Sequence, residues 1–193
     1  MSKIALTPNA SGTGTLTIAA PNTSTDRTLT LPDETGTVLS SASDITSQAM
    51  NGPVFSVHLT TSTNVSHGVA TKIPFETEQF DTASCFDSST NYRFTPNIAG
   101  YYQMNAGVRC GFSGTNEWWL GLYKNGGAYQ RASNWIGLTA SHIFGTLSSI
   151  VYLNGSTDYV ELYFFQYSGS TQTIVGNGSG LITYWNGSLI RAA

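Results

Sequence analysis

The feature that most constrains the fold is the spacing of apolar residues, which alternate with polar ones over many short stretches from residue 54 onward. No segment of useful length shows helical spacing, and β-branched and aromatic residues dominate these stretches. Tight-turn pairs of asparagine and glycine separate several of them: Asn125-Gly126, Asn154-Gly155 and Asn177-Gly178. The sequence therefore predicts an all-β protein, a two-sheet jelly-roll sandwich. The expected strands are Val54–Leu59, Tyr101–Cys110, Trp118–Tyr123, Ile143–Leu153, Tyr159–Tyr167 and Leu181–Leu189.

Aromatic residues and a glycine are regularly placed in the segment 75–102, which reads Phe-x5-Asp-x4-Phe and then Phe-x5-Gly-x-Tyr. The second half predicts a strand that ends at Phe94, a proline-containing turn, and a new strand that opens at Gly100. A glycine at that point allows close approach of another backbone or a bulge. In the new strand, Tyr102 is expected to point to the face opposite Tyr101.

This spacing resembles the signature of the complement component 1q globular head, which shares a superfamily with tumour necrosis factor. Three later segments resemble the family in the same order: Leu122–Gly126 its mid-domain strand and turn, Gly155–Val160 the start of a long strand, and Tyr184–Ile190 its closing strand. One extra residue before Phe94 departs from the family spacing and is interpreted as a loop insertion. The resemblance covers residues 54–193 and implies a jelly-roll head that forms homotrimers.

Composition argues against several classes of partner. Only 10% of the residues are charged, against about 25% in typical globular domains, and the formal net charge is −3. Because affinity for nucleic acid depends on concentrated positive charge, and no Lys/Arg cluster occurs, no nucleic-acid partner is expected. No apolar stretch reaches about 18 residues and none at the start resembles a signal peptide, so we expect synthesis in a cytoplasm without membrane insertion. The favoured state of Cys85 and Cys110 is two buried thiols, with pairing left open.

The first forty residues differ in character from the rest. Two short segments alternate hydroxyl and aliphatic residues, and they contain too few apolar residues to fold without a partner. Their aliphatic positions are Leu16, Ile18, Leu29 and Leu31. Residues 15–39 resemble a short module found near the N-termini of tailed-bacteriophage virion proteins, particularly fibre and structural proteins. The resemblance implies that residues 1–40 dock onto a phage capsid or tail protein, with these four residues as the anchor.

The chain is thus expected to have three parts. Residues 1–40 form the N-terminal docking segment, extended and β-like. The serine-rich residues 41–53 form a linker that ends at a proline. Residues 54–193 form the jelly-roll head.

One predicted strand, within residues 159–167, is apolar on both faces. One face suits the core, whereas the other carries an aromatic row of Tyr159, Tyr163, Phe165 and Tyr167. Burying one such side chain contributes about 2 kcal/mol, so the row favours cover by another subunit over exposure to water. Cover by a loop of the same chain is the alternative. We therefore predict that the aromatic row lines the interface of a homotrimer.

Little in the sequence points to catalysis or to a cofactor. The three histidines lie far apart, and neither a Cys-x-x-Cys pair nor a Gly-x-Ser-x-Gly turn occurs. A loose acidic cluster could hold calcium, but a solvated acidic loop is the favoured interpretation: Glu76, Glu78, Asp81 and Asp87. Among the tryptophans, Trp135 lies in the most polar stretch and is the best candidate to stack on a glycan, although tryptophan more often packs in a core.

The leading hypothesis is a non-enzymatic virion protein of a tailed bacteriophage: a homotrimeric short fibre, head fibre or capsid decoration that displays an adhesive head. Display in several copies would raise avidity for a glycan or protein of the host surface. One alternative is a receptor-binding tail-fibre tip. Another is a cellular adhesin or carbohydrate-binding module, which the lack of a signal peptide disfavours. An enzyme acting on polysaccharide ranks last, because no paired carboxylates can be identified.

Overall fold

The computed structural model describes residues 11–15, 17, 22–26, 28, 52–112, 117–135, 142–178 and 180–193. The chain divides into two compact units, Met1–Ser40 and Ser41–Ala193. In the first unit, the described residues include a turn in which the amide of Thr25 donates to Thr23 Oγ1 (3.1 Å). The predicted anchor residues lie outside the described residues: Leu16, Ile18, Leu29 and Leu31.

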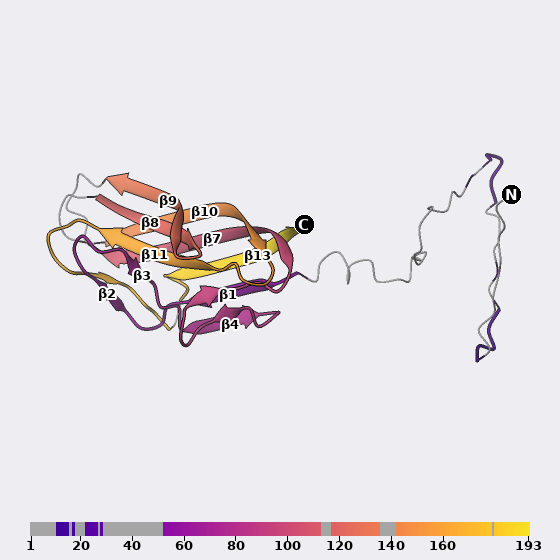
Figure 1. Ribbon diagram of the computed structural model, residues 1–193, viewed down its shortest axis with the longest axis horizontal. Coiled ribbons are helices and arrows are strands. Elements are labelled where there is room, and N and C mark those ends of the chain that lie inside the picture. The colour runs from indigo at the N-terminus through magenta and orange to yellow at the C-terminus, as the bar shows by residue number, and fades with distance from the viewer. Residues whose placement is uncertain are drawn as a thin grey trace. The chain divides into compact units, whose positions relative to one another are not determined.

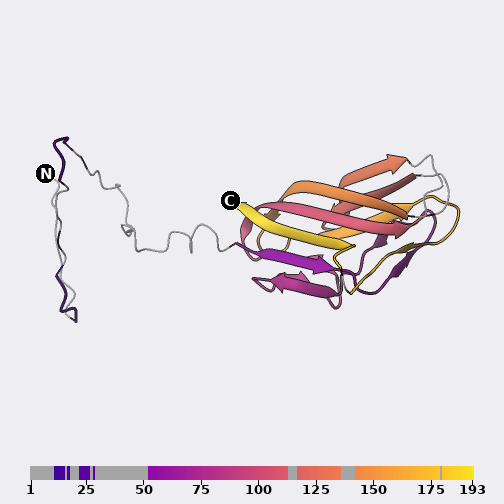
Figure 2. The ribbon, with the colours of Figure 1, turned by 180° about the vertical axis from the view of Figure 1, so that it is seen from behind.

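The second unit is a sandwich of two antiparallel sheets (Figures 1 and 2). The first sheet comprises β1 (Val54–His58), β2 (Thr63–Val65), β4 (Thr77–Asp81), β7 (Ala99–Gly111), β10 (His142–Asn154), β12 (Gln172–Ile174) and β13 (Tyr184–Ala192). The second sheet comprises β3 (Thr71–Lys72), β5 (Phe86–Asp87), β6 (Arg93–Phe94), β8 (Glu117–Lys124), β9 (Gly127–Trp135) and β11 (Val160–Gln166). This arrangement confirms the all-β, two-sheet architecture that the sequence predicts. In the part of the chain that the structure describes, no helix has the length and apolar character needed to cross a bilayer.

Strand β7 is the centre of the first sheet. It pairs along its whole length with β10 on one side, and with β13 and then β12 on the other. Strand β1 joins β13 to β4, and β2 extends β12. In the second sheet the order is β5-β6-β11-β8-β9, with β3 also on β11. All six expected strands are present. Strands β4 and β9 and, apart from β6, the strands of two or three residues were not predicted, since they show too little apolar alternation.

The core between the sheets is aromatic. Phe55 lies at its centre: its ring stacks on Phe94 at 4.4 Å and on Phe86 at 5.3 Å, and meets Trp185 edge-on at 5.2 Å. All four side chains are buried, and each contributes roughly 2–3 kcal/mol by leaving water. Phe86 and Phe94 belong to the regularly spaced segment 75–102, so that spacing specifies core positions.

Two turn-related predictions are confirmed. At Gly100 an added Cβ would collide with Arg191 O and the Leu189 side chain, and the pairing of β13 with β7 shifts between those two residues. Asn125 and Gly126 have φ values of 52° and 79°, which form the tight turn between β8 and β9.

The chain enters and leaves the head at the same end, as Figures 1 and 2 show for β1 and the C-terminus. Val54 pairs with Ser188 there, and the amide of Ala193 donates to Ala99 O (3.0 Å). Strands β1 and β7 run away from this end, and β10 and β13 run back towards it. The opposite end, here called the distal end, includes the segments 59–70 and 167–183.

Candidate functional site

The outer face of the first sheet carries several exposed apolar side chains. Buried and exposed residues alternate over all of β10, and its outward positions include Phe144, Ile150 and Tyr152, which are 54, 53 and 40% exposed. Tyr101 of β7 (45% exposed) lies beside Tyr152, with ring centroids 5.5 Å apart, and Ile190 of β13 is 52% exposed. These five residues define what we call the first-sheet face.

A hollow of about 550 Å³ opens on the first-sheet face. Its lining consists of Tyr101, Ile150, Ile190, Arg191, Ala192 and Ala193. Tyr101, Ile150 and Ile190 are large apolar side chains, Arg191 is a cation, and Ala192 and Ala193 are small residues at and just after the end of β13. The hollow can therefore receive an apolar side chain from another molecule.

An uncharged polar cluster lies on the same side of this sheet. Gln103 Nε2 donates to Ser148 Oγ (2.9 Å) and Asn105 Oδ1 (3.2 Å), and Ser148 Oγ donates to the same Asn105 oxygen (3.0 Å). Asn105 Nδ2 reaches Asn186 Oδ1 at 3.4 Å. Because these groups bind one another, a second protein surface can cover them at a lower desolvation cost than charged or unpaired groups would impose.

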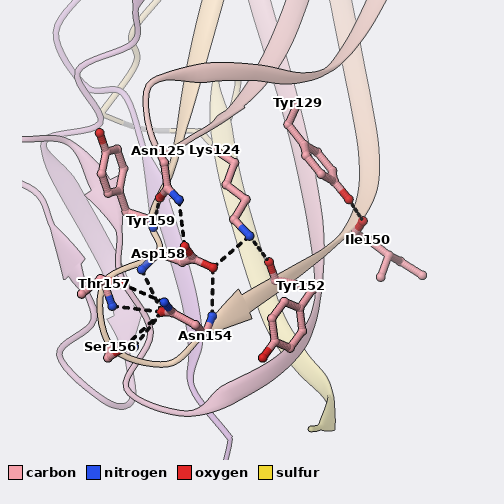
Figure 3. A network of polar contacts seen from close by, with 10 residues as sticks. All are labelled: Lys124, Asn125, Tyr129, Ile150, Tyr152, Asn154, Ser156, Thr157, Asp158 and Tyr159. Carbon is pink, nitrogen blue, oxygen red and sulfur yellow. Dashed lines mark hydrogen bonds and ion pairs between the residues drawn. The ribbon is translucent and has the colours of Figure 1, made fainter.

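The free edge of β10 is capped by side chains from the second sheet. The three bonds run from Lys124 Nζ to Tyr152 O (2.8 Å), from Tyr129 OH to Ile150 O (3.0 Å) and from Gln130 Nε2 to Ser148 O (3.2 Å). Figure 3 shows the first two. On an edge strand, the carbonyls of alternate residues point outward and can pair with a strand of another chain. These three carbonyls instead bind within the head.

Lys124 also belongs to a polar network that joins the β8–β9 turn to the loop between β10 and β11 (Figure 3). Its Nζ forms an ion pair with Asp158 Oδ2 (2.8 Å), and Asn125 Nδ2 donates to Asp158 Oδ1 (2.8 Å). The bonds from Lys124 and Asn125 hold the pKa of the Asp158 carboxyl below its usual value. Asn154 Oδ1 accepts bonds from three successive backbone amides of the loop. The network fixes the loops and positions Lys124 over the β10 edge.

The aromatic row lies on the outer face of the second sheet. The structure brings its members into line along and just beyond β11: Tyr159, Tyr163 and Phe165 are half-buried, and Tyr167 is 54% exposed. Neighbours from β8 stack against the row, Tyr123 on Tyr163 at 4.2 Å and Trp119 on Phe165 at 5.0 Å. The Arg131 guanidinium lies 4.3 Å from the Trp119 ring centroid. Much of the row is thus covered within the chain, and its role as a subunit interface stays a prediction.

Trp135 is the last residue of β9, where its backbone pairs with Glu117. Its side chain lies outside the described part of the structure. The predicted glycan contact at Trp135 therefore stays a prediction.

The carboxylates of the acidic segment bind protein groups. Glu76 Oε1 accepts from Thr60 Oγ1 (2.6 Å) and from the Thr61 amide (2.6 Å). Glu78 Oε1 accepts from Ser88 Oγ (2.6 Å). Asp81 Oδ2 accepts from the Phe86 amide (2.6 Å), and Asp87 Oδ1 accepts from the Thr90 amide (2.9 Å). Burial alone raises the pKa of Glu76, but the bonds from Thr60 and Thr61 outweigh it and lower that pKa. Within the described residues, no three potential metal ligands come together.

The two cysteines are free, buried thiols, as favoured from the sequence. Burial raises the pKa of Cys110 to about 12, and burial also raises the pKa of Cys85. Neither thiol is therefore a ready nucleophile.

The first-sheet face was not predicted from the sequence. The signal was present, because the predicted strand Ile143–Leu153 places Phe144, Ile150 and Tyr152 at positions of one parity, opposite its core positions. An apolar residue at an outward position marks a surface that needs cover, as it does in the aromatic row.

No family model and no curated protein matches this sequence. Solved structures match its head. Eiger TNF from S. frugiperda has a TM-score of 0.54 at 10% identity, over 74% of this chain and 95% of that one. Murine APRIL at pH 8.5 has a TM-score of 0.51 at 10% identity, over 72% and 98% respectively. At such identities the likeness shows the fold alone. The head is a TNF-like two-sheet jelly roll, which confirms the predicted fold class.

Proposed function

We propose that this chain is the subunit of a homotrimeric, non-enzymatic display protein of a tailed-bacteriophage virion, either a short fibre, a head fibre or a capsid decoration. Three heads assemble through the first-sheet face, and residues 1–40 dock onto a capsid or tail protein of the particle. The assembled heads are displayed for adhesion to the host surface, where three linked sites raise avidity.

The observation that carries this proposal is the first-sheet face. Its exposed apolar residues flank or adjoin an uncharged cluster whose polar groups bind one another. Interface cores are enriched in aromatic residues, as this surface is. Its central polar cluster is uncharged, and two arginines lie at its margins, Arg109 across from Phe144 and Arg191 at the hollow. The hollow beside Tyr101 and Ile150 offers a place for a side chain of the neighbouring copy. We therefore assign assembly to this face and not to the aromatic row.

The capped edge of β10 supports assembly face to face. A strand whose outward carbonyls are occupied is a poor template for adding a strand from another chain. Contact through side chains on a face is compatible with a closed ring of identical subunits. The number three comes from the resemblance to the complement and tumour-necrosis-factor superfamily.

The N-terminal segment supports the virion assignment. It resembles a module of phage virion proteins, and its few aliphatic residues require a partner to bury them. In this proposal Leu16, Ile18, Leu29 and Leu31 make the contact, and the protein resides on the particle.

Two measurements test the proposal. Light scattering on the purified full chain is expected to give three times the chain mass of 20.6 kDa, and a stable monomer would overturn the assembly. Removing residues 1–40 is expected to leave a trimeric head that no longer joins phage particles. Normal incorporation of the truncated chain would overturn the docking assignment.

A further inference from the structure

Two loops that are distant in sequence are joined at the distal end of the head. The amide of Gly169 donates to His67 Nδ1 (2.9 Å), and the amide of Gly68 donates to Gln166 O (2.8 Å). The rings of His67 and Tyr167 have centroids 4.2 Å apart. We call residues 65–70 and 167–171 the distal loop pair.

A buried amide sets the shape of the distal loop pair. Gln166 is fully buried, and its Nε2 donates to Val65 O (3.0 Å) and Ser170 O (2.8 Å) while its Oε1 accepts from the Ser168 amide (2.7 Å). Both amide protons and the carbonyl oxygen are thus used, so the loops are held in one arrangement. Gln172, also buried, donates to the hydroxyls of Ser168 and Ser170 (2.8 and 3.0 Å). A surface fixed in advance loses less entropy when it binds.

The outward side of the distal loop pair combines an aromatic ring with small polar groups. Tyr167 is 54% exposed and Val69 is 52% exposed. His67 and Ser170 are also exposed. The Tyr167 ring lies against Gly68, whose φ of 72° favours glycine. The loops thus hold a large aromatic side chain in solvent beside hydroxyl and backbone groups.

The loop segments of the distal end differ in charge from the turns at the opposite end. The segments 59–70 and 167–183 contain no Asp, Glu, Lys or Arg. The turns at the other end carry the Lys124–Asp158 ion pair. The charged residues that contact these segments are Glu76, whose carboxylate is bound by Thr60 and Thr61, and Glu117, whose backbone oxygen accepts from the Tyr167 amide. An uncharged ligand rich in hydroxyls would find hydrogen-bonding partners in the distal segments at little desolvation cost.

We propose that the distal loop pair binds an uncharged carbohydrate of a cell surface. A pyranose ring has an apolar C–H face and hydroxyl edges, which match the Tyr167 ring and the adjacent serine and backbone groups. The inference rests on the proposed function, because it names the class of host ligand that the displayed heads contact. Three such sites in one trimer give strong adhesion from weak single contacts.

The test uses the full chain on a printed array of oligosaccharides. Neutral polymers of glucose, mannose, galactose and N-acetylglucosamine are compared with acidic polymers of uronic and sialic acids. We expect binding to at least one neutral glycan, with no loss between about 0.05 and about 0.5 M sodium chloride. Tyr167→Ala is expected to weaken this binding about tenfold or more. Phe80→Ala is the matched control, because Phe80 is an aromatic residue of similar exposure, 49%, on β4.

The outcomes separate this inference from the proposed function. Light scattering on each variant shows whether the trimer is kept. A trimer that binds no neutral glycan, or only acidic ones, overturns the inference and leaves the assembly intact. Equal losses for Tyr167→Ala and Phe80→Ala also overturn it. A monomer that binds neutral glycans through Tyr167 supports the inference and overturns the proposed assembly.

Discussion

The two outer faces of the sandwich bury aromatic surface in different ways. On the second sheet, Phe165 and Tyr163 stack on rings from the neighbouring strand β8, and Trp119 is left only 6% exposed. On the first sheet, Tyr101 contacts Tyr152, but Ile150 and Phe144 remain more than half exposed. The number of aromatic residues on a strand therefore says less about assembly than what lies across from them.

The largest expected effect comes from placing a charge on the first-sheet face. Ile150→Asp would bury a carboxylate in the proposed interface, at a cost of about 3 kcal/mol or more, and is expected to convert the trimer to monomer. Light scattering at fixed concentration measures the change. Val69→Asp is the matched control, because Val69 is 52% exposed and Ile150 is 53% exposed. If both variants stay trimeric, the assembly face is misassigned.

The next effect distinguishes the two faces directly. Tyr163→Ser removes the stack on Tyr123 and is expected to lower the free energy of unfolding by roughly 1–3 kcal/mol without changing the assembly. Tyr152→Ser, on the first-sheet face, is expected to weaken assembly and to destabilise the separate head less. Chemical denaturation and light scattering on both variants give the two readouts. Dissociation by Tyr163→Ser alone would restore the aromatic row as the interface.

A smaller effect on stability is expected at the capped edge of β10. Tyr129→Phe removes only the hydroxyl that donates to Ile150 O, and is expected to reduce stability by about 0.5–1.5 kcal/mol. Amide hydrogen exchange in β10 should rise at the same time. Unchanged exchange and unchanged stability would show that this bond does not hold the edge.

The smallest effect is that of pH on the Lys124–Asp158 pair. Because the folded pKa of Asp158 is lowered, its stabilising contribution is present above the unfolded value near 3.9 and is lost as pH falls through the folded pKa. Asp158→Asn should therefore cost about 0.2–1 kcal/mol at pH 7 and progressively less below about pH 4. Thermal unfolding of both proteins across this range measures the difference. A difference in stability between the two proteins that persists at the lowest pH would contradict the proposed role of the ionised Asp158.

The sequence was sufficient for the architecture because strand periodicity and turn chemistry are local. Gly100 takes the close-contact position that the sequence predicts, and Phe86 and Phe94 of the same regularly spaced segment are buried. Which outer face lacks cover could not be predicted, since the cover for Phe165 comes from Trp119 on another strand. The number of rings in a row is visible in a sequence, but their partners across strands are not.

The distal loop pair was beyond prediction for the same reason. Its bond from Gly169 to His67 joins residues 102 positions apart, and neither loop carries a recognisable motif. In the sequence, nothing distinguishes Gln166 from other polar residues of a strand. In the fold it is buried, and both its amide nitrogen and its amide oxygen form hydrogen bonds. The absence of charge in the distal segments is visible in the sequence. It gains meaning only once the fold brings those segments to one end.

The capped edge of β10 has a consequence for crowding. At high protein concentration, free strand edges nucleate cross-β fibrils. Three separate side chains occupy this edge: Lys124, Tyr129 and Gln130. Losing any one of them leaves two in place, so protection against fibril formation declines in steps. A single substitution at this edge therefore leaves two of its three outward carbonyls capped.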